Sequence, residues 1–104
     1  MLYRIALALT LAAGCGANDT GIEPMTCSQE STLTYENFGK DVIDTHCNEC
    51  HDTRSPRLTT IAGIRAAKDA ILDEAVYTDA MPEKSGMPLQ QRELLGEWLS
   101  CGAP

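Results

Sequence analysis

Residues 46 to 51 read HCNECH, and this cluster of two cysteines and two histidines decides how the rest of the chain is interpreted. Three kinds of chemistry use such a cluster: covalent haem attachment, zinc binding and thiol–disulfide exchange. Cys47, Cys50 and His51 supply what haem attachment needs, namely one thiol for each vinyl group and an imidazole for the iron. The remainder of the sequence has to distinguish the three chemistries.

Zinc and thiol exchange fit the sequence less well than haem attachment. A structural zinc site usually takes four ligands in two pairs, and the other candidate thiols, Cys27 and Cys101, are single and far apart. A thiol oxidoreductase places Cys-x-x-Cys at the start of a helix that follows a strand. Here the motif stands at the end of a predicted helix, and no segment has the pattern of a strand.

Length, charge and cysteine content restrict the class of protein. A chain of 104 residues forms one small domain at most, and such a small core usually needs a disulfide or a bound cofactor. The 15 acidic and 8 basic residues give a formal net charge of −7, which argues against nucleic acid and favours basic partners. Five cysteines indicate an oxidising compartment such as the bacterial periplasm.

The N-terminus, MLYRIALALTLAAGC, has the layout of a secretory signal. Arg4 precedes a mostly apolar run from Ile5 to Ala13, which is too short to span a bilayer. The end of the run, LAAGC, resembles the lipobox of bacterial lipoproteins, in which cleavage occurs before a cysteine that carries lipid. We therefore predict a lipoprotein signal over residues 1–14 and a lipid on Cys15, on the periplasmic side of a bacterial membrane. If Cys15 is not acylated, the protein is soluble in the periplasm.

The remainder is predicted to be a flexible tether, residues 15–26, followed by one all-α domain, residues 27–104. Apolar spacing and end signals predict three helices: Tyr35–His46 with Thr34 as N-cap, Ile61–Tyr77, and a last helix with Pro88 at its first position and Gly102 past its end. In the last helix the expected buried stripe is Leu94, Leu95, Trp98 and Leu99. The connecting segments, 52–60 and 78–88, are polar and contain prolines, which predicts loops.

A haem bound through His51 has a second axial position that a side chain fills or leaves open. His46 lies too near the cluster to reach the opposite face of the ring. The remaining candidates are Met81, Met87 and Met25, of which Met25 in the tether is the least suitable. Met81 and Met87 lie in a polar loop and each precedes a proline, although methionine also fills gaps in protein cores.

From Thr34 to Leu99 the chain resembles a small class I monohaem c-type cytochrome. That family has a helix leading into Cys-x-x-Cys-His, a distal methionine in a loop, and a C-terminal helix that crosses the first one. Gly39 and Ile43 lie where the family has a small and a large residue at this crossing, and Trp98 lies where it has an aromatic residue. A glycine lets two helix backbones approach, and an aromatic ring fills the groove that remains.

The resemblance implies a small cytochrome c-like fold of about three helices around one covalent haem c. Haem attachment would use Cys47 and Cys50, with His51 and Met81 as axial ligands. The register favours Met81 over Met87, because Pro88 lies seven residues after Met81, the spacing that the family has before its last helix.

Two finer features of the site stay open at this point. In the family a proline carbonyl often accepts a hydrogen bond from the proximal histidine, and Pro56 is a candidate for that part. Several cationic side chains are candidates to neutralise haem propionates, although each also suits a plain surface position: Lys40, Arg54, Arg57, Arg65 and Lys84.

The function that the resemblance implies is electron transfer to and from redox partner proteins, without enzymatic activity. A net negative charge should speed encounter with a basic partner, and salt should slow it. Two alternatives stay open: a haem enzyme or gas sensor with an open distal site, and a fixed haem relay subunit of a membrane redox complex.

Cys27 and Cys101 remain once lipid and haem have taken the other three thiols. A disulfide between them would use every cysteine and would tie the end of the tether to the end of the last helix. Two free buried thiols, or a bridge to another molecule, are the alternatives.

Overall fold

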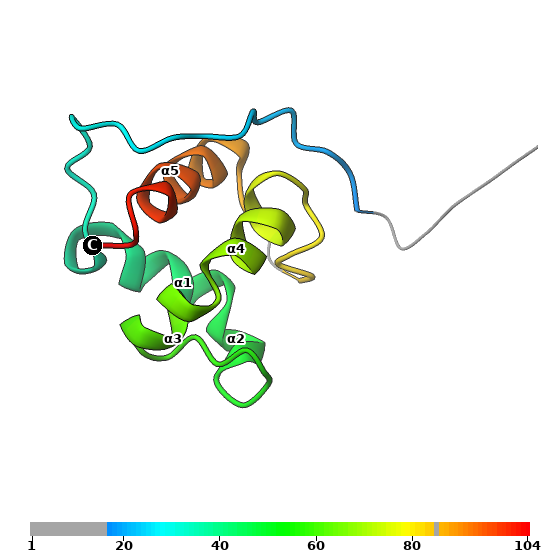
Figure 1. The fold of residues 1–104 in the computed structure, drawn as a ribbon. Helices are drawn as coiled ribbons and strands as arrows, with labels where there is room; N and C mark the ends of the chain where they lie inside the picture. The colour runs from blue at the N-terminus through cyan, green and yellow to red at the C-terminus, as the bar shows by residue number, and fades with distance from the viewer. Residues whose placement is uncertain (1–16, 85) are drawn as a thin grey trace, which may run out of the picture.

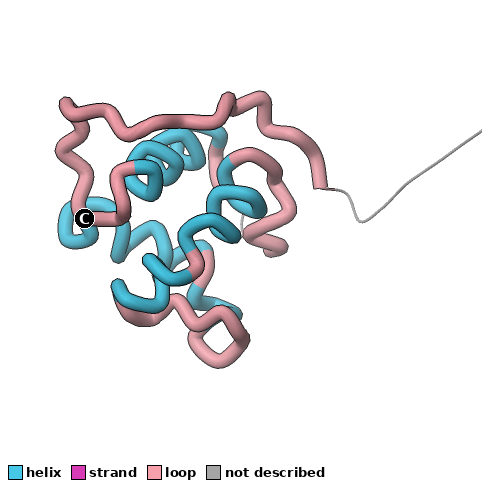
Figure 2. The backbone as a smooth tube through the Cα atoms, in the orientation of Figure 1, coloured by secondary structure: helices cyan, strands magenta, loops and turns pink. Residues whose placement is uncertain are grey.

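A computed structural model of the chain describes residues 17–84 and 86–104. The signal predicted over residues 1–14 and the lipid site predicted at Cys15 lie outside the described residues. Within them the regular structure is helical, without a strand, and one isolated bridge pairs Asp19 with Thr78 (Figures 1 and 2). The predicted all-helical architecture is therefore present over this part of the chain.

The first predicted helix is confirmed, with a π-helical beginning. The π-helix η1, Tyr35–Gly39, continues directly into α1, Lys40–His46. Thr34 caps it as predicted: its hydroxyl accepts from the N–H of Asn37 at 3.0 Å, and the Asn37 side chain accepts from the N–H of Thr34 at 2.7 Å. After Cys47 the chain starts a separate short helix, α2, Asn48–His51, which contains the rest of the motif.

The second predicted helix is divided into three pieces. These are α3, Ile61–Ala66, α4, Lys68–Ile71, and the π-helix η2, Leu72–Val76. The interruption falls at Ala67, which has a ψ of 8° and is neither glycine nor proline. Ile64, Ala75 and Val76 from this region are all buried in the core, so packing and not a local breaker sets the division.

The last helix, α5, runs over Leu89–Ser100 and lies alongside the N-terminal segment (Figure 1). Pro88 is its N-cap, so the helix begins at Leu89, one residue later than predicted. Leu95, Trp98 and Leu99 are fully buried, as expected from their spacing, whereas Leu94 is 37% exposed and does not belong to the buried stripe.

Where the first helix, formed by η1 and α1, crosses α5, a glycine of η1 contacts an indole ring. Gly39 is so close to Trp98 that a Cβ atom added to it would overlap the indole ring. Tyr35 stacks near that ring with centroids 6.4 Å apart, and Phe38 approaches it edge-on at 6.2 Å. Ile43, one turn further along α1, is also fully buried. The roles expected for Gly39, Ile43 and Trp98 in helix packing are therefore confirmed.

The described part of the predicted tether differs from a flexible linker. The N–H of Thr20 donates to the carbonyl of Tyr77 at 3.0 Å, and its hydroxyl donates to the carbonyl of Val76 at 2.6 Å. Met25 packs against Gly96 of α5, and its N–H donates to the Tyr77 hydroxyl at 3.1 Å. The segment thus lies along the domain (Figure 1), because hydrogen-bonding groups of distant residues hold a stretch whose own composition is that of a loop.

Cys27 and Cys101 lie at disulfide distance, with their sulfur atoms 2.02 Å apart. The pair joins the N-terminal segment to the end of α5 across 74 residues of sequence. A cross-link over so long a loop restricts the unfolded chain strongly.

Gly39→Ala should destabilise the domain, because the Trp98 ring is fully buried and has no space to move into. Overpacking a core costs about 1–3 kcal/mol. Better helix propensity returns up to about 1 kcal/mol, so a net loss of roughly 1–2 kcal/mol is expected in urea unfolding. Gly86→Ala is the matched control: a Cβ atom at Gly86 meets nothing within 4 Å, and stability should change by less than about 0.5 kcal/mol. Equal effects at the two positions would contradict the crossing contact.

Replacing both Cys27 and Cys101 by serine should lower the free energy of unfolding by about 4 kcal/mol, from loop entropy alone. The melting temperature measured by circular dichroism should fall accordingly. A melting temperature equal to that of the wild type would show that the two thiols are not bridged in the protein.

Candidate functional site

The motif helix borders a hollow with mainly apolar walls, which we call the motif hollow. One wall is α2 and the loop after it, with Cys47, Cys50 and His51; α4 and η2 form a second wall, and the loop around Met81 forms a third. The hollow contains about 760 Å³ of space outside protein atoms, part of it open to solvent. Sites for cofactors are concave and mostly apolar, as this hollow is.

The two cysteines of the motif are free thiols in this hollow. Cys47 is 9% exposed and Cys50 is partly buried, and they are not bonded to each other. Burial raises the pKa of the Cys47 thiol to about 11. Thiol exchange requires the opposite, a thiol whose pKa is lowered so that the thiolate is present near neutral pH. The burial of Cys47 therefore disfavours the thiol oxidoreductase alternative.

His51 is oriented by a backbone carbonyl. Its Nδ1 lies 3.2 Å from the carbonyl oxygen of Arg54, and because a carbonyl only accepts, Nδ1 carries the proton in this bond. The other ring nitrogen, Nε2, then has the lone pair that a metal needs. The carbonyl that accepts the hydrogen bond from His51 is therefore that of Arg54 and not that of Pro56. Pro56 lines the motif hollow.

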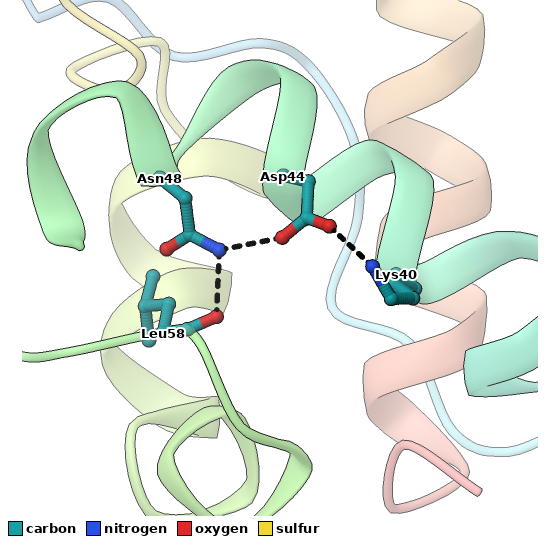
Figure 3. Close-up of polar contacts among 4 residues, drawn as sticks. All are labelled: Lys40, Asp44, Asn48 and Leu58. Carbon is teal, nitrogen blue, oxygen red and sulfur yellow. Dashed lines mark hydrogen bonds and ion pairs between the residues drawn. The ribbon is translucent and has the colours of Figure 1, made fainter.

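Asn48, between the two motif cysteines, connects α1, α2 and the following loop (Figure 3). Its Nδ2 donates to the carboxylate of Asp44 at 2.8 Å and to the carbonyl of Leu58 at 2.9 Å. Asp44 in turn pairs with Lys40 at 2.8 Å. Sequence reasoning missed Asn48, because the motif leaves its middle positions unspecified and gives no signal for this bond. The other middle position, Glu49, is exposed.

The Asp44 carboxylate carries a small dependence of stability on pH. Hydrogen bonds from Lys40 and then Asn48 hold the pKa of Asp44 below its usual value of 3.8. A carboxyl whose pKa is lowered by folding stabilises the folded state above its unfolded pKa. That contribution is lost as the pH falls through the folded pKa, so it is absent only in acid.

The structure separates the three candidate methionines. Met81 lines the motif hollow together with the motif residues. Met87 is 4% exposed and belongs to the hydrophobic core, and it does not line the hollow. Met25 packs against Gly96 at a different place. Of the three thioethers, Met81 is the one that the fold brings to Cys47, Cys50 and His51.

Charged side chains also border the motif hollow. Of the five cationic candidates, Arg54 and Lys84 line it and the other three do not. Lys40 pairs with Asp44, and Arg65 donates from Nε to the carbonyl of Ala103 at 3.0 Å. Glu49, Glu74 and Glu83 line the hollow as well, so cations and carboxylates share its border, and the two cations could face an acidic group of a bound molecule.

No group of three or more His, Cys, Asp or Glu side chains is arranged to hold a metal ion within residues 17–84 and 86–104. Two thiols, the imidazoles of His46 and His51 and the Met81 thioether line the hollow. Cysteine and histidine are the residue types of structural zinc sites, but these four side chains are not arranged as a metal-binding group. Among the described helices, none combines the length and the apolar character needed to cross a membrane.

Comparisons of the chain with models of protein families, with curated proteins and with solved structures find no match.

In the folded chain without cofactor, Cys50 should react with iodoacetamide before Cys47. A pKa of about 11 instead of 9.0 lowers the thiolate fraction of Cys47 near neutral pH about 100-fold, and burial restricts access further. The difference should shrink as the pH is raised towards 11, and peptide mapping after timed quenching measures it. Equal rates at pH 8 in chain that circular dichroism shows to be folded would contradict the burial of Cys47.

Proposed function

We propose that the chain is a small c-type cytochrome that carries single electrons. Haem would be attached through Cys47 and Cys50, with His51 and Met81 as axial ligands. The observation that carries the proposal is the motif hollow. It brings together two free thiols and the imidazoles of His46 and His51 with a thioether that lies 30 residues further along the sequence, from His51 to Met81.

The residues fit a haem in chemistry as well as in number. Two unbonded thiols three residues apart match the two vinyl groups, and the imidazole follows directly. The hydrogen bond from Nδ1 of His51 to Arg54 leaves Nε2 for the iron. Apolar walls suit the faces of a macrocycle, and Arg54 and Lys84 at the border suit its propionates.

A bound haem would supply one-electron redox chemistry, and the protein would set the reduction potential and limit access. Met81 as second ligand raises the potential relative to a second imidazole. The Arg54 carbonyl would fix the ring orientation and basicity of His51. With both axial positions filled by the chain, no position is left for a substrate, and this favours electron transfer over a haem enzyme or gas sensor.

The partners and the location follow from charge and from the N-terminus. The net charge of −7 favours basic redox partners, so added salt should slow electron exchange with them. A lipid on Cys15 would keep the protein on the periplasmic side of a bacterial membrane, and this remains a prediction from the sequence.

The test is the absorption spectrum of protein matured in a periplasm that contains a haem-attachment system. Wild type, Met81→Leu and Met87→Leu form the set, since both substitutions conserve volume and cost less than about 1.5 kcal/mol. We expect a low-spin reduced spectrum in the wild type and a far-red ferric band that Met81→Leu abolishes and Met87→Leu retains. Loss of the band in Met87→Leu alone would move the axial ligand to Met87.

A thiol count gives an independent control. After denaturation and reduction, Cys47 and Cys50 should resist alkylation, because thioether bonds have consumed them, while Cys27 and Cys101 should react. Alkylation of both motif cysteines in protein from haem-attaching cells would refute the proposal. A wild type that carries haem but has no methionine-dependent band would instead favour the open distal site of a sensor or enzyme.

A further inference from the structure

Arg92 is the one charged side chain that is buried among the residues that the structure describes, with 6% of its surface exposed. It lies on α5, and its donors reach three backbone carbonyls. Nε donates to Met87 at 3.1 Å, and Nη1 donates to Ala75 at 2.8 Å and to Met81 at 2.7 Å. No carboxylate pairs with it within the described part of the chain. Carbonyl dipoles therefore balance the charge of a guanidinium that is mostly out of water.

The three carbonyls belong to the loop that carries Met81 and to its two ends. Ala75 lies in η2 just before the loop, and Met87 lies just before the N-cap of α5. The N–H of Met81 donates to the carbonyl of Glu74 at 2.7 Å. Both polar groups of the Met81 backbone are thus held, the N–H by η2 and the carbonyl by α5, while the residue lines the motif hollow.

We propose that Arg92 is a positioning residue for the axial ligand Met81. This inference rests on the proposed function. The guanidinium is planar and its donors form a rigid fork, so it holds the three carbonyls in one arrangement. Displacement of the thioether by movement of the loop would break the bonds to Arg92. Arg92 therefore disfavours displacement of Met81 without touching the haem.

A merely structural role for Arg92 would lower stability but would leave ligand exchange unchanged. Two control variants separate these effects. Gly39→Ala perturbs the contact between η1 and α5, which lies outside the Met81 loop. It therefore shows how lower stability alone affects imidazole binding. Arg65→Gln removes another arginine that donates to a carbonyl, that of Ala103, again outside the loop.

The experiment uses haem-containing protein and titrates the ferric form with imidazole, which competes with the thioether for the iron. For Arg92→Lys and Arg92→Gln we expect imidazole to bind about tenfold more tightly than to the wild type, with a weaker far-red band at a temperature well below unfolding. Gly39→Ala and Arg65→Gln should titrate like the wild type. Lysine keeps the positive charge but lacks the planar set of donors. If Arg92→Gln accumulates too little protein, the imidazole titration of Arg92→Lys alone tests the proposal.

Two results would overturn the inference. One is wild-type imidazole affinity in the Arg92 variants, and the other is an equal gain in affinity in Gly39→Ala, which would show that general stability controls ligand exchange. Failure of the proposed function is distinguishable from both, because it would appear in the wild type as the absence of haem or of the methionine-dependent band before any Arg92 variant is compared.

Discussion

The contact between Gly39 in η1 and the Trp98 indole in α5 sets how closely the first and last helices approach. The ring is fully buried, with Tyr35 and Phe38 beside it, so the crossing has little freedom to slide. Continuing from α1, the chain enters Cys47 and α2, which form one wall of the motif hollow. Arg92, on α5, donates to the carbonyl of Met81 in the loop that forms another wall. One wall thus follows the first helix in the chain, and another is held by a side chain of the last helix.

Backbone carbonyls organise the candidate site more than side-chain pairs do. The Arg54 carbonyl orients His51, the Leu58 carbonyl holds Asn48, and the Met81 carbonyl is held by Arg92. Carbonyls are present at every residue, so such contacts place a side chain without requiring a particular partner type. The sequence therefore has a motif for the cysteine and histidine cluster itself, but it needs no particular residue type at the positions whose carbonyls orient that cluster.

Pro104 and the segment around Cys27 tie the chain together beside the helix crossing. Trp98 donates from its indole nitrogen to the carbonyl of Pro104 at 3.1 Å, and the N–H of Tyr35 donates to the same carbonyl at 2.6 Å. Cys27 and Cys101 add a covalent link at this end. A domain of this size has few apolar contacts to spare, and links of this kind are what small domains use in their place.

The sequence by itself determined the helices, the motif and the crossing. Thr34 and the apolar spacing after it located the first helix, because both signals lie along one segment. Gly39 and Trp98 were placed at the helix contact by the resemblance to a family pattern and not by local spacing. The tertiary structure alone decided that the helix predicted over Ile61–Tyr77 divides at Ala67 and that residues after Asn18 lie along the domain. It also decided that Met81 lines the hollow while Met87 fills the core, and that Arg92 is buried. These features depend on which carbonyls and cavities distant segments bring together, and no local pattern records that.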